Sequence, residues 1–403
     1  MALAVAVAEG GVRLLRPREP SIASAEVELG TYFTAEEIER GRRFARPQMA
    51  LGLARAATEL IALGAVVRRP PRVLERTVAG PFIDGGLTAA GLVVALSLPP
   101  LPIAAVARRR AIAVGLITQS WRGWALDLVK ATGIEGVLAG GAGGLVLVAI
   151  RRYPRWWWLL AAAGSVFVGA LLATLAPVVL DPVFNDFTAL PEGETRSDVL
   201  ELARAAGVEV GEVYSVDASR RTTAANAYVT GLGPTKRVVL FDTLLDRYSR
   251  DEIRVVVAHE LAHVRGRDVW RGVAFAALVA PAGALGVQRL GSLLSPRQST
   301  PAVLPALALS AGIVMAPVGL VANRLSRALE RRADAYSLTL SQAPDAFISF
   351  ERSIAVQNVA DLDPPRWATA LLASHPPTIE RIGFAVTFAS RSVPPSRRTP
   401  AGS

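Results

Sequence analysis

The chain contains three histidines, and two of them, His259 and His263, enclose Glu260 in a His-Glu-x-x-His pattern. On a helix, residues four apart project from the same face, so both imidazoles can bind one metal ion. Glu260 lies beside them, where its carboxylate can take a proton from a metal-bound water. Because histidine is so scarce in this chain, the pattern predicts a zinc hydrolase rather than an incidental pair of side chains.

A catalytic zinc ion takes three protein ligands and leaves one position for water, so one further ligand must come from elsewhere. The chain has no cysteine, which leaves His375 or a downstream carboxylate. Glu330 and Asp334 are four residues apart on a predicted helix, so one can bind zinc while the other accepts the free N–H of a ligand histidine. The alternative for these two acids is a solvated face paired with Arg331 and Arg332. The residues alone leave the third ligand open.

The composition indicates that a membrane must surround part of the chain. Hydrophobic residues make up 51% of it and charged residues 19%, which is unusual for a soluble protein. A helix needs about 20 apolar residues to cross a bilayer, and six stretches approach that length. The clearest are 85–107, 156–180 and 302–322, and the weaker are 48–67, 133–150 and 272–294. The sequence therefore predicts a mainly α, polytopic membrane protein with about six transmembrane helices, although a weaker stretch could also be a buried or interfacial helix.

These spans separate membrane regions from polar segments, and two polar segments lie on the same side because two spans intervene. The expected organisation is an N-terminal cytoplasmic segment at 1–47, four spans within 48–180, a catalytic segment at 181–268, two spans within 269–325, a second catalytic segment at 326–389 and a disordered tail at 390–403. Short strands are predicted at 212–216 and 236–241. Arginines favour the side of the polar segments, which predicts a cytoplasmic catalytic face in a bacterial cell membrane.

The net charge of +10 comes almost entirely from arginine, since Lys130 and Lys236 are the two lysines of the chain. No module of interleaved aromatic and basic residues accompanies this charge. We therefore expect the lipid bilayer, and no nucleic acid, among the partners of the protein.

Several separated motifs between about residues 180 and 382 occur in an order that resembles a known family. They are residues 181–188, 190–194, 226–228 and 237–244, the histidine pair, the acidic run 326–334, Ser374-His375-Pro376-Pro377 and Glu380-Arg381. Together they resemble the integral-membrane zinc metalloproteases related to type I CAAX prenyl proteases. The resemblance implies a zincin-like catalytic domain with a small β-sheet, and an arginine-biased chain of this kind resembles a bacterial member.

For the metal, the resemblance implies one zinc ion per chain, bound by His259, His263 and Glu330. It implies that the Asp334 carboxylate accepts a hydrogen bond from a ligand histidine and that Glu260 is the general base. His375 is then a donor to the developing oxyanion instead of a zinc ligand, which suits an imidazole N–H.

For the substrate, the resemblance places Asn226 and Ala227 on an edge strand, where a peptide can add as a further strand. Arg381 is implied to support the oxyanion or His375, with a surface salt bridge as an equal alternative. The expected partner is accordingly a peptide or a membrane-associated protein segment.

The leading expectation is a membrane-embedded zinc endopeptidase. Its substrate class stays open between CAAX-like processing and clearance of misfolded membrane proteins, as in related heat-shock membrane proteases. The chain departs from the eukaryotic relatives at Thr222–Ala225, where they carry a run with serine and histidine. Two other function classes are a transporter with a regulatory metal and an inactive scaffold. Few ionisable residues fall within the spans, which disfavours a transporter.

Overall fold

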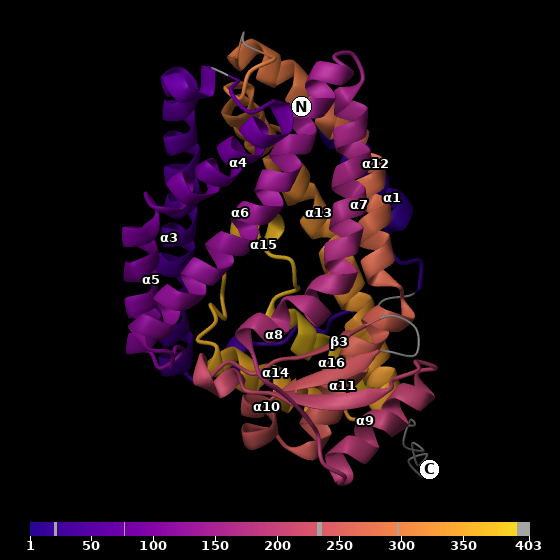
Figure 1. The fold of residues 1–403 in the computed structure, drawn as a ribbon. Coiled ribbons are helices and arrows are strands. Elements are labelled where there is room, and N and C mark those ends of the chain that lie inside the picture. The colour runs from indigo at the N-terminus through magenta and orange to yellow at the C-terminus, as the bar shows by residue number, and fades with distance from the viewer. Residues whose placement is uncertain (20–21, 76, 232–235, 296–297, 393–403) are drawn as a thin grey trace, which may run out of the picture.

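The computed structural model of this chain describes residues 1–403 except 20–21, 76, 232–235, 296–297 and 393–403. Long helices make up one end of the elongated molecule, and a four-stranded sheet with its covering helices makes up the other end (Figure 1). Most of the predicted tail, 390–403, lies outside the described residues.

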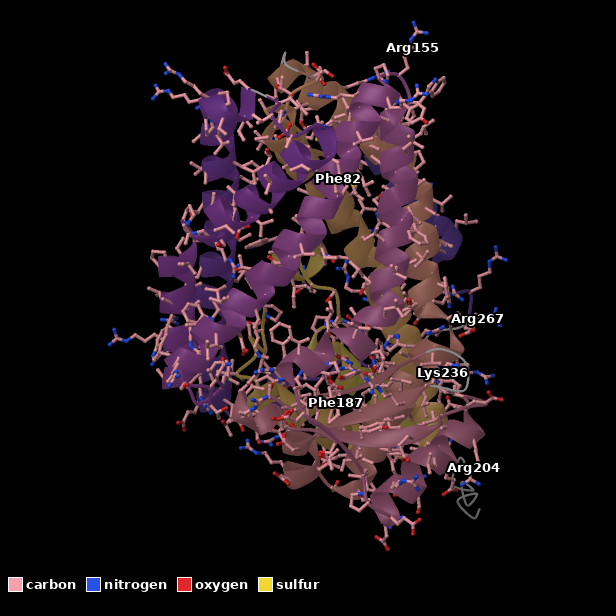
Figure 2. The ribbon with its side chains drawn as sticks, viewed as in Figure 1. Phe82, Arg155, Phe187, Arg204, Lys236 and Arg267 are labelled. Atoms are coloured by element: carbon pink, nitrogen blue, oxygen red, sulfur yellow. The ribbon has the colours of Figure 1, made fainter. Side chains whose placement is uncertain are left out.

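Five helices of the described chain are long and apolar enough to cross a membrane. They are α3 (Ala35–Arg68), α6 (Trp121–Arg152), α7 (Trp157–Val179), α12 (Asp268–Leu294) and α13 (Val303–Ser341). Large apolar side chains project outward from them, for example Val137, which is 77% exposed, and Phe167, which is 67% exposed. Such surfaces are suited to lipid and not to water. Arg155 projects from the end of the molecule opposite the sheet (Figure 2), beyond this apolar band.

The sixth predicted span, at 85–107, is a bent pair of helices and not one straight helix. α4 (Pro81–Ser97) and α5 (Leu101–Ala113) meet at an angle of 50°. The bend falls at Pro99 and Pro100, which lack the N–H that a continuing helix would use and whose rings clash with the preceding turn. The prediction of about six transmembrane helices is therefore confirmed as five continuous helices and one broken pair.

The predicted N-terminal segment contains helices that reach the membrane region. α1 (Ala2–Leu15) packs against α12 and α13, with Ala4 and Ala8 fully buried beside Phe275 and Val314. A short α2 (Leu29–Tyr32) follows. α3 begins at Ala35, where Thr34 accepts from Glu37 N and completes a capping box. This helix thus starts well before residue 48, where the sequence placed the first span.

The sheet consists of β1 (Phe187–Ala189), β2 (Glu212–Val216), β3 (Ala227–Thr230) and β4 (Arg237–Phe241), in the order β1-β2-β4-β3. β2 and β4 correspond to the two short strands predicted from residue patterns, and β3 contains Ala227, which the resemblance placed on an edge strand. They run parallel, while β1 and β3 are antiparallel to their neighbours. Val213, Val238 and Leu240 are fully buried, because one face of the sheet packs with α9 (Glu194–Ala205) and α11 (Arg250–Arg265) around the main core. β3 is left at an edge.

Shorter helices complete the catalytic end. They are α8 (Asp181–Phe184), α10 (Asp242–Arg247), α14 (Pro344–Gln357), α15 (Arg366–Leu371) and α16 (Thr378–Ser392), with the 3₁₀ turn η2 (Ala218–Arg220). A second 3₁₀ turn, η1 (Arg72–Glu75), lies at the opposite end, where Ala302 N donates to Leu74 O beside the start of α13. α13 continues from the membrane region into this end and packs along α11. One helix therefore carries both a span and part of the candidate site.

Candidate active site

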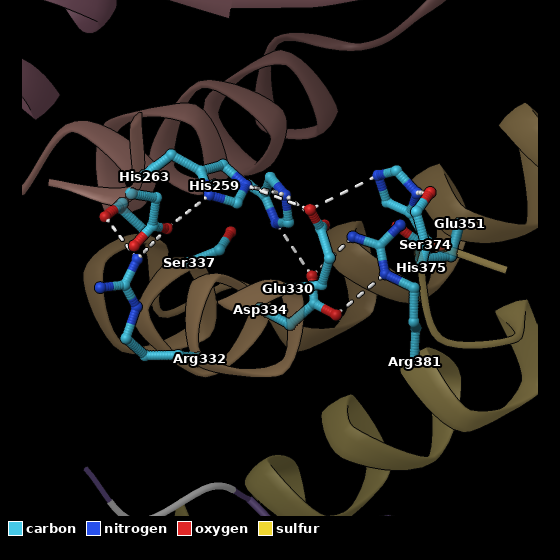
Figure 3. A network of polar contacts seen from close by, with 12 residues as sticks. His259, His263, Glu330, Arg332, Asp334, Ser337, Glu351, Ser374, His375 and Arg381 are labelled. Atoms are coloured by element: carbon cyan, nitrogen blue, oxygen red, sulfur yellow. Dashed lines mark hydrogen bonds and ion pairs between the residues drawn. The ribbon is translucent and has the colours of Figure 1, made fainter. Parts of the chain in front are cut away.

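α11 positions the histidine pair, and its start is defined by a second capping box. Ser249 N donates to Glu252 Oε2 at 2.8 Å, and Glu252 N donates to Ser249 Oγ at 3.3 Å. Val257 and Leu261 are fully buried, which fixes the rotation of the helix. The face with His259 and His263 consequently turns toward α13 (Figure 3).

Three candidate ligand atoms converge between α11 and α13 (Figure 3). His259 Nε2 lies 3.1 Å from His263 Nε2 and 3.3 Å from Glu330 Oε2, and His263 Nε2 lies 3.6 Å from Glu330 Oε1. Zinc bonds of about 2.0–2.1 Å at tetrahedral angles would place ligand atoms about 3.3 Å apart. The residues thus have the separations that a zinc ion requires, with Glu330 rather than His375 closing the set.

The charges of this cluster also fit a cation. Glu330 Oε2 is buried and has no hydrogen-bond donor among the described residues, although His259 Nε2 is near it. Burial opposes a charge on His259, yet the adjacent Asp334 and Glu330 carboxylates outweigh burial and raise the pKa of the imidazole to about 10. A site that attracts a proton this strongly favours any positive charge, and two histidines with a carboxylate are a donor set suited to zinc.

The outer nitrogen of His259 contacts the carboxylate that the sequence predicted. Asp334 Oδ1 lies 2.9 Å from His259 Nδ1, and the Asp334 side chain is fully buried. A proton held on Nδ1 leaves the lone pair of Nε2 free for a metal. Arg381 in turn donates from Nε to Asp334 Oδ2 at 2.9 Å.

Arg381 is the centre of a buried charge network. Its Nη1 lies 2.6 Å from Glu351 Oε1 on α14, and the Glu351 side chain is 2% exposed. Burial raises the pKa of Glu351 to about 7, even though the Arg381 charge acts in the opposite direction. No pattern in the sequence pointed to Glu351. That Arg381 binds substrate stays a prediction, since the guanidinium is directed at Asp334 and Glu351 (Figure 3).

The outer nitrogen of His263 has a carboxylate partner that the sequence analysis missed. His263 Nδ1 lies 2.8 Å from Asp268 Oδ2, at the first residue of α12. The signal in the sequence would have been an acidic residue just beyond the end of the histidine helix. Its use as a partner depends on the turn that joins α11 to α12, which residue spacing does not define.

His375 lies in the loop between α15 and α16 at the open side of the cluster. Its side chain is 62% exposed, and its Nε2 lies 3.5 Å from Glu330 Oε1. Ser374 Oγ lies 2.9 Å from His375 Nδ1. The imidazole is therefore near enough to act on a substrate bound beside Glu330, while its assignment to the oxyanion stays a prediction.

A cavity of about 810 Å³ connects the candidate general base with the edge of the sheet. Glu260 and His263 line it, together with Tyr228 and Val229 of β3 and the nearby parts of α7 and α12. Burial raises the pKa of Glu260 above its ordinary value. Glu260 thus lies against a space large enough for a peptide segment.

The predicted substrate-binding pair lies at this sheet edge. Ala227 is the first residue of β3 and its side chain is buried, while the Asn226 side chain just before it is exposed. Phe241 N donates to Asn226 O at 3.0 Å, so in the antiparallel pattern the backbone groups of Ala227 and Val229 point away from β4. Within the described residues, the outer edge of β3 therefore has no strand partner, and β3 shares the cavity with Glu260. That Asn226 and Ala227 bind substrate stays a prediction.

Models of known protein families match this chain over most of its length. Residues 189–387 match the model of peptidase family M48, and residues 113–186 match that of the CAAX prenyl protease N-terminal region with five membrane helices. The metalloprotease YhfN of Bacillus subtilis, described as uncharacterized, is 32% identical over 299 residues, which cover 72% of this chain and 70% of that protein.

CAAX prenyl proteases match over shorter segments. CAAX prenyl protease 1 of Saccharomyces cerevisiae is 35% identical over 156 residues, 38% of this chain and 34% of its own length. The homolog from Oryza sativa is 31% identical over 220 residues, 53% and 52% of the two chains. The crystal structure of Ste24p from S. mikatae superposes with a TM-score of 0.77 over 95% of this chain and 97% of that one, at 20% identity. This last likeness shows a shared fold.

Proposed function

The chain belongs to peptidase family M48, and from this premise we propose that it is an endopeptidase with one zinc ion held by His259, His263 and Glu330. Family membership and the membrane helices make it an integral-membrane metalloprotease. The observation that carries the zinc proposal is the convergence of the three ligand atoms, with a buried Glu330 oxygen that lacks a donor within the described chain.

In this proposal the chemistry of the residues follows from their positions. When bound, zinc lowers the pKa of a water molecule and polarises the scissile carbonyl. Glu260 would accept a proton from the attacking water molecule and deliver it to the leaving amine, a task suited to a carboxylate whose pKa burial has raised. The His375 imidazole donates to the oxyanion as it develops. Asp334 holds His259 with Nε2 directed inward.

The edge strand β3 supports an extended binding mode for the substrate. Ala227 and Val229 turn their backbone groups toward the open edge, and β3 shares the cavity with Glu260. A peptide that pairs there would be held mainly by main-chain hydrogen bonds. Such binding places a scissile bond near the metal with little demand on the side chains of the substrate.

For the physiological substrate we favour CAAX-like processing. The Asn226-Ala227-Tyr228 and Ser374-His375-Pro376-Pro377 motifs and the relatives named CAAX prenyl proteases support this class. Clearance of misfolded membrane proteins is the second class. We infer that the catalytic end faces the cytoplasm of a bacterial cell, because the arginines near the start of α3 lie there, with Arg46 paired to Asp361 at 2.8 Å.

The experiment that tests the proposed function compares purified wild-type protein with Glu260→Gln. Zinc content and cleavage of a panel of quenched peptides, prenylated and unmodified, are measured for both. We expect one zinc per chain in both proteins and cleavage in the wild type alone. Glu201→Gln, at an exposed position on α9, is the matched control and should cleave as the wild type does. Absence of zinc from the wild type after metal supplementation would refute the proposal.

A further inference from the structure

We propose that Asp268 and Arg332 form a positioning pair that fixes the imidazole of His263 for zinc. The proposal rests on the zinc site proposed above and adds two residues that do not touch the metal themselves. It assigns to His263 the kind of support that Asp334 and Arg381 give to His259.

The contact between Asp268 and His263 is direct and largely shielded from water. Asp268 Oδ2 lies 2.8 Å from His263 Nδ1, and the Asp268 side chain is 9% exposed. Arg267 adopts a left-handed conformation with φ 54° in the turn between α11 and α12. This turn brings the start of α12 back beside the last turn of α11, so that Asp268 reaches His263 across it.

Arg332 connects the Asp268 carboxylate to α11 through two hydrogen bonds. Its Nη2 donates to Asp268 Oδ2 at 2.5 Å and to the carbonyl oxygen of Ala262 at 3.0 Å, and its side chain is 7% exposed. Ala262 immediately precedes His263. A single guanidinium nitrogen thus ties the backbone of α11 and the carboxylate of Asp268 together, which holds both in a defined relation to the imidazole.

Gly266 provides the space that this arrangement needs. A Cβ added at Gly266 would lie 1.5 Å from Arg332 Nη1 and 2.1 Å from its Cζ. The backbone of Gly266 has an ordinary helical φ of −74°, so glycine is required there for room and not for conformational freedom. Gly266 therefore leaves the space that the Arg332 guanidinium occupies beside α11, the helix that carries the two histidines.

The two carboxylate oxygens of Asp268 have different contacts, and the close contacts are at the oxygen that faces His263. Oδ2 contacts both His263 and Arg332, whereas Oδ1 is buried, makes no hydrogen bond in the described part of the chain and lies 3.7 Å from Arg271 Nε. Helix α12 has no side-chain cap, so the carboxylate does not serve to cap it. The carboxylate is directed at the imidazole.

The expected consequence of removing Asp268 is weaker zinc binding. Without an acceptor at Nδ1, the His263 ring can rotate, and it can carry its proton on Nε2, where the metal must bind. Loss of such an outer partner typically weakens metal affinity by 10- to 100-fold. Asn at this position can keep its amide oxygen at the place of Oδ2 and put its NH₂ at the place of Oδ1, which makes no hydrogen bond within the described chain and would lose a 3.7 Å ion pair with Arg271.

The test measures the zinc dissociation constant of the purified full-length protein by competition with a chromogenic chelator. Asp268→Ala is expected to bind zinc 10- to 100-fold more weakly than the wild type, Asp268→Asn within about threefold of the wild type, and Arg332→Met about tenfold more weakly. Glu380→Ala is the matched control. It removes an ion pair of 2.6 Å with Arg331, which lies on α13 beside Arg332, and this ion pair does not contact a ligand histidine. It should bind zinc as the wild type does.

The outcomes separate this inference from the proposed function. Tight zinc binding by the wild type and by a folded Asp268→Ala would overturn the inference and leave the proposed function intact. Equal weakening by Asp268→Ala and Asp268→Asn would also overturn it, because charge and not the acceptor would then matter. If Asp268→Ala fails to fold, the Asn and Met variants still decide the question. A wild type without zinc would overturn both.

Discussion

Ser337 on α13 donates a hydrogen bond of 2.7 Å from its hydroxyl to the carbonyl oxygen of Val255 on α11. Both residues are buried, Ser337 completely. The bond lies about one turn from His259 along α11 and from Asp334 along α13. It therefore fixes the register between the helix that carries the histidines and the helix that carries Glu330, which come from segments about 70 residues apart in the chain.

Replacement of Ser337 by Ala should lower the free energy of unfolding by about 1 kcal/mol, since one buried hydrogen bond is lost without a large cavity. Ser337→Leu should be more damaging, because the added atoms would force α11 and α13 apart. Thermal denaturation of the detergent-solubilised protein measures both effects. Ser390→Ala, which removes an exposed hydroxyl on α16, is the control. A Ser337→Leu variant as stable as this control would contradict the close contact.

The structure brings His259, His263 and Glu330 together as a group that could hold a metal ion, and local spacing explains why the sequence could point to them. His259 with His263, and Glu330 with Asp334, are each four residues apart on a helix, and four-residue spacing places side chains on one face. The meeting of α11 with α13, and the choice of Glu330 over His375 as the third ligand, came from the resemblance. Asp334 Oδ1 lies 2.9 Å from His259 Nδ1, and its role as the acceptor of that imidazole stays a prediction.

The residues that sequence reasoning missed depend on tertiary structure. Asp268 reaches His263 through a turn with a left-handed residue, and Glu351 comes to Arg381 from a different helix. Hydropathy likewise located 85–107 as one span, because it sums side chains and does not register the backbone break at Pro99 and Pro100. α1 was missed as a membrane-region helix because its 14 residues are too few to span a bilayer.

The buried Glu351 should give the protein a measurable pH dependence of stability. Its pKa is raised by burial from an ordinary 4.5 to about 7. Between these values the folded protein keeps a proton that the unfolded chain releases, so stability falls as pH rises from about 4.5 to 7 and the loss is complete above 7. The contribution is at most roughly 3 kcal/mol.

Glu351→Gln should remove this contribution, since Gln stays neutral and can still accept from Arg381. We expect the denaturation temperature of the variant to match that of the wild type near pH 5 and to exceed it by several degrees near pH 7.5. Glu201→Gln controls for the replacement of a carboxylate at an exposed site. Parallel pH curves for wild type and Glu351→Gln would rule out the buried titration.

His375 should be needed for turnover and not for metal binding. His375→Ala removes a donor to the oxyanion, so we expect kcat to fall by about 10²- to 10³-fold with one zinc retained and KM little changed. If His375 were instead a zinc ligand, the variant would lose zinc as Glu330→Ala does. Ser374→Ala removes the hydroxyl 2.9 Å from His375 Nδ1 and should cause a smaller loss of kcat. Zinc analysis and steady-state kinetics of the three variants distinguish the two roles.

The open edge of β3 makes the most specific prediction about substrate binding. The backbone N–H of Val229 points away from β4 and toward the side where a peptide would pair. Val229→Pro removes this N–H, and proline is tolerated on a strand edge where the ladder is not interrupted. We expect KM to rise about tenfold or more with a smaller change in kcat, because a main-chain contact present in both the ground state and the transition state is lost.

Val229→Ala is the matched control for this variant, since it shortens the side chain but keeps the N–H, and its KM should stay close to that of the wild type. Tyr228→Pro provides the opposite case. The backbone N–H of Tyr228 faces β4 in the same pattern. Loss of this N–H should destabilise the sheet and lower the denaturation temperature. Peptide cleavage kinetics and thermal denaturation of the three variants are measured together. A wild-type KM in a folded Val229→Pro protein would mean that the substrate does not pair with β3 at this residue, and would shift the binding site to the helical walls of the cavity.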